Sequence, residues 1–165
     1  MGIRLGTRDS GLMSHSAFLI VSFAVFLTIA GSASQSLPDS PGKDVFESVC
    51  SLCHAPTAPF GKQWTKPQWE AKVTEMLQEE PEVTTEERAA IVEYLAANFK
   101  PGGKIYVNYG KAKELETALE LSTKDAEAMV RYREGNGPFK TVDDVKQVPG
   151  LDVAKIEVKK DRLEF

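Results

Sequence analysis

Residues 50–54 read Cys50-Ser51-Leu52-Cys53-His54, and this stretch decides how the first half of the chain folds. Cysteines three positions apart lie on one face of a helix, so both thiols can reach the same bound group. The histidine that follows can turn its imidazole onto a metal at the centre of that group. The pattern C-x-x-C-H is the attachment signature of c-type haem. The stretch therefore predicts one covalent haem c, bound through Cys50 and Cys53, with His54 on the iron.

Other uses of closely spaced cysteines fit the surroundings less well. A thioredoxin-like C-x-x-C motif lies in a βαβ context, and no strand pattern surrounds residues 50–54. A zinc site needs four ligands, and the adjacent Cys53 and His54 rarely both reach one tetrahedral ion. A chance match stays open, but export of the chain would favour haem attachment.

The first 33 residues indicate a signal peptide. Arg4 and Arg8 precede an apolar run of 14 residues, Ala17 to Ala30, which only Ser22 and Thr28 interrupt. A membrane span needs about 20 apolar residues, whereas the apolar part of a signal peptide has about 7–15. We expect cleavage after Ala33, which places the mature chain in the periplasm or elsewhere outside the cytoplasm with no stable membrane span. An uncleaved membrane anchor is the alternative.

Composition separates the mature chain into two parts. Residues 34–42 are rich in serine and proline and predict a flexible leader. Lys100-Pro101-Gly102-Gly103 ends a helix and forms a joint, so we place a linker at 101–104 between domains at 43–100 and 105–165. The first part has a net charge of −5, and the whole chain has a net charge of −4. Such a balance argues against a protein whose main task is to coat nucleic acid.

The segments around the cysteine motif have helical periodicity and no strand pattern, so the first domain is expected to be all-α. Thr84 and Glu87 form a capping box that begins the last of its helices. The expected apolar faces carry Val45, Phe46, Val49 and Leu52, then Trp69, Val73, Met76 and Leu77, and finally Ile91, Tyr94, Leu95 and Phe99.

The second axial ligand of the iron is expected to be Met76. Cleavage of the signal removes His15, so His54 is the single histidine of the mature chain and only Met76 and Met129 offer a thioether. Met76 shares an apolar helix face with Trp69, whereas Met129 has an ordinary core position in the second domain. A core role for Met76, or an open iron, is the alternative. Ligation by His and Met suits electron transfer rather than oxygen chemistry.

These residues resemble the small monohaem class-I cytochromes c. The likeness consists of the Cys50–His54 motif, the pattern Trp69, Val73, Met76 and the closing helix at residues 91–99. It covers about 60 residues and implies a small cytochrome c fold. Packing of Trp64 or Trp69 on the haem ring, and a hydrogen bond from the His54 ring to a carbonyl near Pro56 or Pro59, are expected on the same basis; core filling and an ordinary loop are the alternatives.

The second half predicts four helices in two helix-hairpin-helix units. Expected caps are Ser122 with Asp125, and Thr141, while Val148–Asp152 forms a hairpin. This half resembles the tandem helix-hairpin-helix domain of the secreted DNA-uptake receptor family. The matching stretches are Val107-Asn108, Lys113-Glu114-Leu115, Tyr132-Arg133, Asn136-Gly137-Pro138-Phe139-Lys140 and Val148-Pro149-Gly150.

The two hairpins depart from that family's pattern of Gly-x-Gly, whose backbone N–H groups meet phosphates. Glu120 lies in the first hairpin, which has no glycine, and Asp152 follows Gly150 in the second. Each hairpin thus carries a carboxylate that would repel phosphate. Lys124, Lys155, Lys159 and Lys160 could still touch a nucleic-acid backbone, so DNA binding stays an alternative to protein docking.

The sequence therefore predicts an exported cytochrome that carries single electrons and is not an enzyme. Its haem c is held by Cys50, Cys53, His54 and Met76, and the helix-hairpin-helix domain docks it to a redox partner protein. One rival is an extracytoplasmic DNA-binding protein that carries a haem. Another is a small haem enzyme or gas sensor, which would require an open iron.

Overall fold

The computed structural model describes Gly2 and residues 36–165. The signal peptide predicted at 1–33, with His15, lies outside the described residues except for Gly2. Within this described part, no helix is long and apolar enough to cross a membrane. The described residues 36–165 belong to one compact unit.

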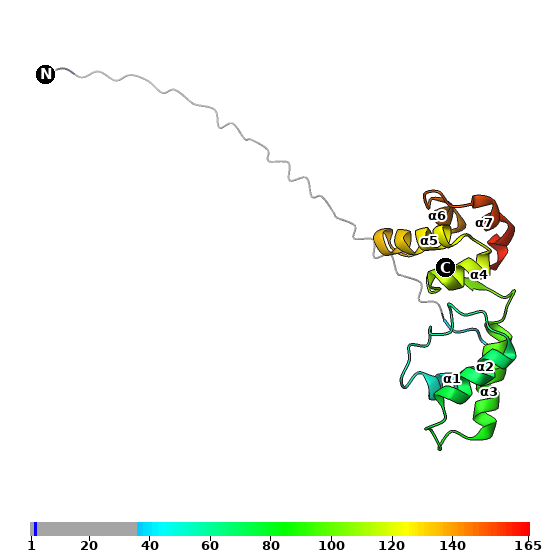
Figure 1. Ribbon diagram of the computed structural model, residues 1–165. Helices are drawn as coiled ribbons and strands as arrows, with labels where there is room; N and C mark the ends of the chain where they lie inside the picture. The colour runs from blue at the N-terminus through cyan, green and yellow to red at the C-terminus, as the bar shows by residue number, and fades with distance from the viewer. Residues whose placement is uncertain (1, 3–35) are drawn as a thin grey trace. The chain divides into compact units, whose positions relative to one another are not determined.

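The first half of this unit is built from α1 (Lys43–Cys50), α2 (Lys66–Met76) and α3 (Thr85–Asn98). Helix α3 packs against both α1 and α2, as Figure 1 shows. The capping box predicted at its start is confirmed, because Thr84 Oγ1 accepts from the Glu87 N–H at 3.2 Å and the Glu87 carboxylate accepts from the Thr84 N–H at 2.9 Å. The core of this half consists of Leu37, Phe46, Phe60, Trp69, Val73, Leu77, Ile91, Val92, Tyr94, Leu95, Phe99 and Tyr106.

The leader predicted to be flexible is held against α3 in its described part. Leu37 is buried in the core of the first half. The Tyr94 hydroxyl donates to the Pro38 carbonyl at 3.0 Å, and the Asn98 side chain donates to Ser40 Oγ at 2.8 Å. These contacts could not be predicted from a composition rich in serine and proline. They depend on one buried leucine and on two hydrogen-bond donors, Tyr94 and Asn98, that lie more than 50 positions further along the chain.

The second half contains α4 (Ala112–Leu119), α5 (Thr123–Asn136), α6 (Val142–Lys146) and α7 (Val153–Lys159). The predicted N-caps are confirmed: Ser122 Oγ accepts from the Asp125 N–H and Thr141 Oγ1 from the Asp144 N–H, both at 3.1 Å. Its core is separate and consists of Ile105, Val107, Leu115, Leu119, Leu121, Ala126, Met129, Phe139, Val145, Val148, Leu151, Ile156 and Leu163.

The expectation of an entirely α-helical chain needs one correction. The strands β1 (Ile105–Tyr106) and β2 (Leu163–Glu164) form a parallel pair, with Ile105 opposite Leu163. A 3₁₀ turn at Lys160–Arg162 leads into β2. Two-residue strands are too short for an alternating pattern in the sequence. The pair joins the beginning and the end of the second half. The described part of the chain therefore contains a small parallel sheet in addition to its seven α-helices.

The loop before α2 packs against the second half. The Phe60 ring stacks on the Tyr106 ring with centroids 4.3 Å apart, and Lys62 forms an ion pair with Glu114. Gly61 is required here because a Cβ atom at this position would lie 2.9 Å from the Cα of Gly110. The halves therefore have separate cores and are in contact through this loop. That residues 101–104 act as a linker stays a prediction.

Met129 is a core residue of the second half whose truncation we expect to be costly. Its side chain is 0% exposed, so Met129→Ala should lower the free energy of unfolding by about 2–5 kcal/mol. Val158→Ala is the control, because Val158 is 84% exposed and should change stability by less than about 0.5 kcal/mol. Denaturant unfolding measures both, and equal values for the two variants would contradict the core described above.

Candidate haem site

The cysteine motif lies where α1 ends. Cys50 and Cys53 were expected on one face of a helix, but α1 ends at Cys50 and Cys53 lies in the turn that follows. The His54 N–H nevertheless donates to the Cys50 carbonyl at 3.1 Å, so one helix-like hydrogen bond spans the motif. This bond keeps the imidazole-bearing residue within one turn of the first thiol. Cys50 is half-buried, whereas Cys53 and His54 are exposed.

Two pockets border the motif and share the same central residues. One, of about 150 Å³, is mostly apolar, and the other, of about 240 Å³, opens beside Leu52 and Cys53. The residues that line both pockets are Cys50, His54, Val73 and Met76. The structure thus brings Cys50, His54 and Met76 to one place, with Cys53 at the second pocket.

The walls of the smaller pocket come from all three helices and from the loop before α2. Trp69 is buried on α2, and its indole N–H donates to the Phe99 carbonyl at 3.1 Å. Trp64 lies beside it, with ring centroids 4.7 Å apart. The remaining residues of this lining are Phe46, Ala58, Pro59, Lys62, Lys72 and Leu95. Three of these residues were not among the expected site residues. Ala58 and Lys62 lie in a loop, which has no periodicity from which a lining residue could be predicted, and Leu95 was assigned to the core.

The donor set fits haem c better than a zinc or dithiol site. Burial raises the pKa of the Cys50 thiol. Both cysteines are free thiols, and among residues 36–165 no cluster of three or more His, Cys, Asp or Glu side chains could hold a metal ion. Apolar walls with two thiols, an imidazole and a thioether suit a large, flat, apolar group.

The His54 ring was expected to donate to a carbonyl near Pro56 or Pro59. The Pro59 carbonyl accepts from the Lys62 N–H at 2.9 Å. Within the described part of the chain, the His54 ring forms no hydrogen bond, so its orientation towards a carbonyl near Pro56 or Pro59 stays a prediction.

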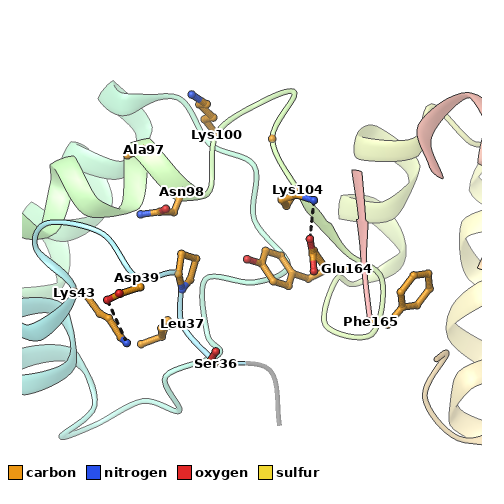
Figure 2. Close-up of a pocket in the computed structure, with 13 residues that line it drawn as sticks. Ser36, Leu37, Asp39, Lys43, Ala97, Asn98, Lys100, Lys104, Glu164 and Phe165 are labelled. Carbon is orange, nitrogen blue, oxygen red and sulfur yellow. Dashed lines mark ion pairs between the residues drawn. The ribbon is translucent and has the colours of Figure 1, made fainter. Parts of the chain in front are cut away.

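Another pocket, of about 910 Å³, lies between the leader, the end of α3 and the last strand. Figure 2 shows ion pairs at opposite sides of it, Lys43 with Asp39 at 3.9 Å and Lys104 with Glu164 at 2.8 Å. Since two of its three lysines are matched by carboxylates, we assign no ligand to this pocket.

The first hairpin of the second half, between α4 and α5, forms charged contacts with α7. Glu120 has a φ of 56° in the left-handed region, which is costly for residues other than glycine. Its carboxylate pairs with Lys159, and its carbonyl accepts from the Lys155 ammonium. The hydrogen bond from Lys159 lowers the pKa of the Glu120 carboxyl. Two lysines at this hairpin are therefore occupied within the chain.

The second hairpin, between α6 and α7, is capped by a carboxylate. Gly150 supplies the left-handed turn with a φ of 78°. Asp152 Oδ1 accepts from the Ala154 N–H at 3.2 Å, so one of the free N–H groups at the start of α7 is already used. Both carboxylates noted in the sequence thus lie in the hairpins and take up groups that a phosphate would need.

Comparisons with known proteins identify the second half. Residues 100–164 match the family described as Helix-hairpin-helix motif. An uncharacterized protein of Haemophilus influenzae is 31% identical over 84 residues, which are 50% of this chain and 70% of that protein. Kinesin-like protein KIF22 is 37% identical over 51 residues in Mus musculus and 34% over 50 residues in Xenopus tropicalis, in each case 8% of the kinesin-like protein. No solved structure matches the chain.

Proposed function

The chain belongs to the family of the uncharacterized Haemophilus influenzae protein and ends in a helix-hairpin-helix domain, and we propose that it is an exported electron carrier with one covalent haem c in its first half. One observation carries this proposal. A contiguous, mostly apolar pair of pockets collects Cys50, His54 and Met76, residues that lie up to 26 positions apart, beside Cys53. If the C-x-x-C-H motif had arisen by chance, there would be no reason for Met76 to line the same pockets as Cys50 and His54.

Each residue has a distinct part in the proposed site. Cys50 and Cys53 would hold the haem through thioether bonds, while His54 and Met76 would bind its iron. This pair of ligands would favour the reduced form and raise the reduction potential. The bound haem would supply reversible one-electron chemistry. Trp69, fixed by its bond to the Phe99 carbonyl, would keep one wall of the pocket rigid and dry.

A redox titration tests the assignment as an electron carrier. The proposal expects one reversible one-electron transition, no carbon monoxide binding to the reduced protein at neutral pH, and no loss of signal over repeated cycles. Rapid carbon monoxide binding by the unmodified chain would indicate an open iron and would favour a haem enzyme or gas sensor instead.

DNA binding by the second half is the second candidate, and the helix-hairpin-helix match is the observation that favours it. The hairpin contacts oppose it, because Glu120 and Asp152 place carboxylates where phosphate oxygens would approach. We therefore propose that this half docks the electron carrier to a protein. The unmodified chain should bind duplex DNA no more tightly than about 10⁻⁴ M at physiological salt, the weak end of non-specific binding.

Removing the carboxylates of Glu120 and Asp152 from the two hairpins should strengthen DNA binding. Glu120→Gly with Asp152→Gly would free the Lys159 ammonium and the Ala154 N–H, so affinity should rise and its dependence on salt should steepen. The control is Asp44→Asn with Glu47→Gln, which makes the same change in net charge on α1. Fluorescence anisotropy with a labelled duplex measures both. Sub-micromolar affinity of the unmodified chain at about 150 mM salt would favour the second candidate.

A further inference from the structure

The loop at residues 58–64 borders the smaller haem-site pocket, and we call it the bridging loop. Its residues in the pocket lining are Ala58, Pro59, Lys62 and Trp64. The lining contains one further lysine, Lys72, which pairs with Glu75 on the same helix at 3.0 Å. Lys62 is therefore the cation that the bridging loop brings to a mostly apolar pocket.

The bridging loop is also attached to the second half of the chain. The Phe60 ring stacks on an aromatic ring of β1 and is 2% exposed. Gly61 packs closely against Gly110, and the Gln63 side chain donates to the Lys104 carbonyl at 2.9 Å. Contacts with the second half thus hold a segment that lines the haem-site pocket.

Lys62 connects the pocket to the second half through an ion pair with Glu114 of α4. Both side chains are largely shielded, with 27% of Lys62 and 21% of Glu114 exposed. Glu114 Oε1 meets the ammonium, while its Oε2 accepts from the Lys111 N–H at 2.6 Å. A partly buried pair is screened by salt less than an exposed one, so its charges also act on the pocket beside it.

A haem has two propionate carboxylates in addition to its apolar ring, and a carboxylate that leaves water needs a cation or hydrogen-bond donors. An ammonium has three N–H donors, so Lys62 can bind Glu114 and a second carboxylate together. We propose that Lys62 pairs with a propionate of the bound haem and that Glu114, by sharing this ammonium, lowers the reduction potential from the second half. The inference rests on the proposed haem site, because it assigns a further residue to that site.

The sign of the effect follows from charge. A positive charge near the haem favours the reduced form, because reduction removes one positive charge from the iron. Glu114 neutralises part of the charge that Lys62 brings to the pocket. Losing the carboxylate should therefore raise the potential, and losing the ammonium should lower it.

The first experiment measures the reduction potential of the exported holoprotein and its variants. Glu114→Gln keeps an oxygen that can cap α4 and removes the charge, so the potential should rise. Lys62→Met should lower the potential, whereas Lys62→Arg keeps the charge and should leave it unchanged. Each of the two charge changes should alter the ratio of reduced to oxidised protein by about threefold, or about 30 mV, since tenfold is about 59 mV for one electron. Unchanged potentials in Glu114→Gln and Lys62→Met would overturn the proposal.

The ion pair of Lys113 with Glu116 is the matched control on the same helix. The two groups are 2.8 Å apart, and neither residue lines a haem-site pocket. Glu116→Gln and Lys113→Met make the same changes in net charge and should alter the redox ratio by less than about 1.5-fold. Equal shifts for Glu114→Gln and Glu116→Gln would show that only net charge matters and would overturn the proposal.

A double variant separates sharing of the ammonium from a remote effect of the carboxylate. In the Lys62→Met background, Glu114→Gln should leave the potential nearly unchanged, because Glu114 acts through Lys62. The same rise with and without Lys62 would show that Glu114 acts on the haem by its own charge, and the proposed sharing would be wrong.

Haem content of the same samples keeps the two proposals distinct. If the exported chain holds covalent haem but Glu114→Gln and Lys62→Met leave the potential unchanged, the role of this ion pair is wrong and the haem site stands. If the exported chain holds no haem, both proposals fail.

Discussion

A chain with Cys50→Ser and Cys53→Ser is expected to leave the cell's export pathway with no covalent haem, against one per chain for the unmodified protein. The two thiols are the groups that can form thioether bonds, and no other cysteine exists in the sequence. Both border the pockets whose apolar walls the haem would cover. A half of about 65 residues has little core to spare, so the first half should also melt at a lower temperature.

Staining for covalent haem after denaturing electrophoresis, with thermal melting followed by circular dichroism, measures this result. Ser51→Ala is the matched control, since it changes the same motif and leaves both thiols and His54 in place. The double variant should lose the stain while the control keeps it. An exported double variant with undiminished covalent haem and an unchanged melt would contradict the assignment of the site.

Met76→Ala is expected to have the second largest effect. Met76 lines both pockets together with His54, and its thioether is the expected axial ligand. Losing it should remove the weak near-infrared charge-transfer band of a sulfur–iron bond in the oxidised protein. It should also lower the reduction potential and allow carbon monoxide to bind the reduced protein, because the iron would lose one of its two proposed protein ligands.

Met129→Ala is the control for this spectrum. Met129 is fully buried in the core of the second half, so its truncation should lower stability but leave the near-infrared band and the potential unchanged. If Met129→Ala removed the band and Met76→Ala did not, the haem would be shared between the halves and the proposed ligand pair would be wrong.

Local sequence patterns predicted the helix starts accurately. The Thr84–Glu87 box and the caps at Ser122 and Thr141 depend on residues three positions apart, so their geometry follows from the chain itself. The spacing of Cys50 and Cys53 was less informative, because α1 ends at Cys50 and Cys53 lies in the turn that follows. The meeting of Met76 with this motif was predicted from an apolar face and a count of possible ligands, and the two shared pockets are consistent with it.

Contacts between distant segments were not predictable in this way. The burial of Leu37, the ion pair of Lys62 with Glu114 and the pairing of β1 with β2 each join residues separated by tens of positions. No periodicity marks them, because each involves one or two residues. The helix-hairpin-helix domain was recognised because its caps, turns and short sequence stretches recur together, although Glu120 and Asp152 replace the residues expected at its hairpins.

The central claim is that Cys50 and Cys53 hold one haem. Its most direct measurement is the absorption spectrum of the purified chain, exported in a host that attaches haem c, taken before and after denaturation and acid–acetone extraction, together with the intact mass. The account predicts a reduced spectrum with sharp α and β bands that survives extraction, and a mass equal to the processed chain plus one haem. A chain whose mass equals the polypeptide alone, or whose colour is removed by extraction, would contradict it.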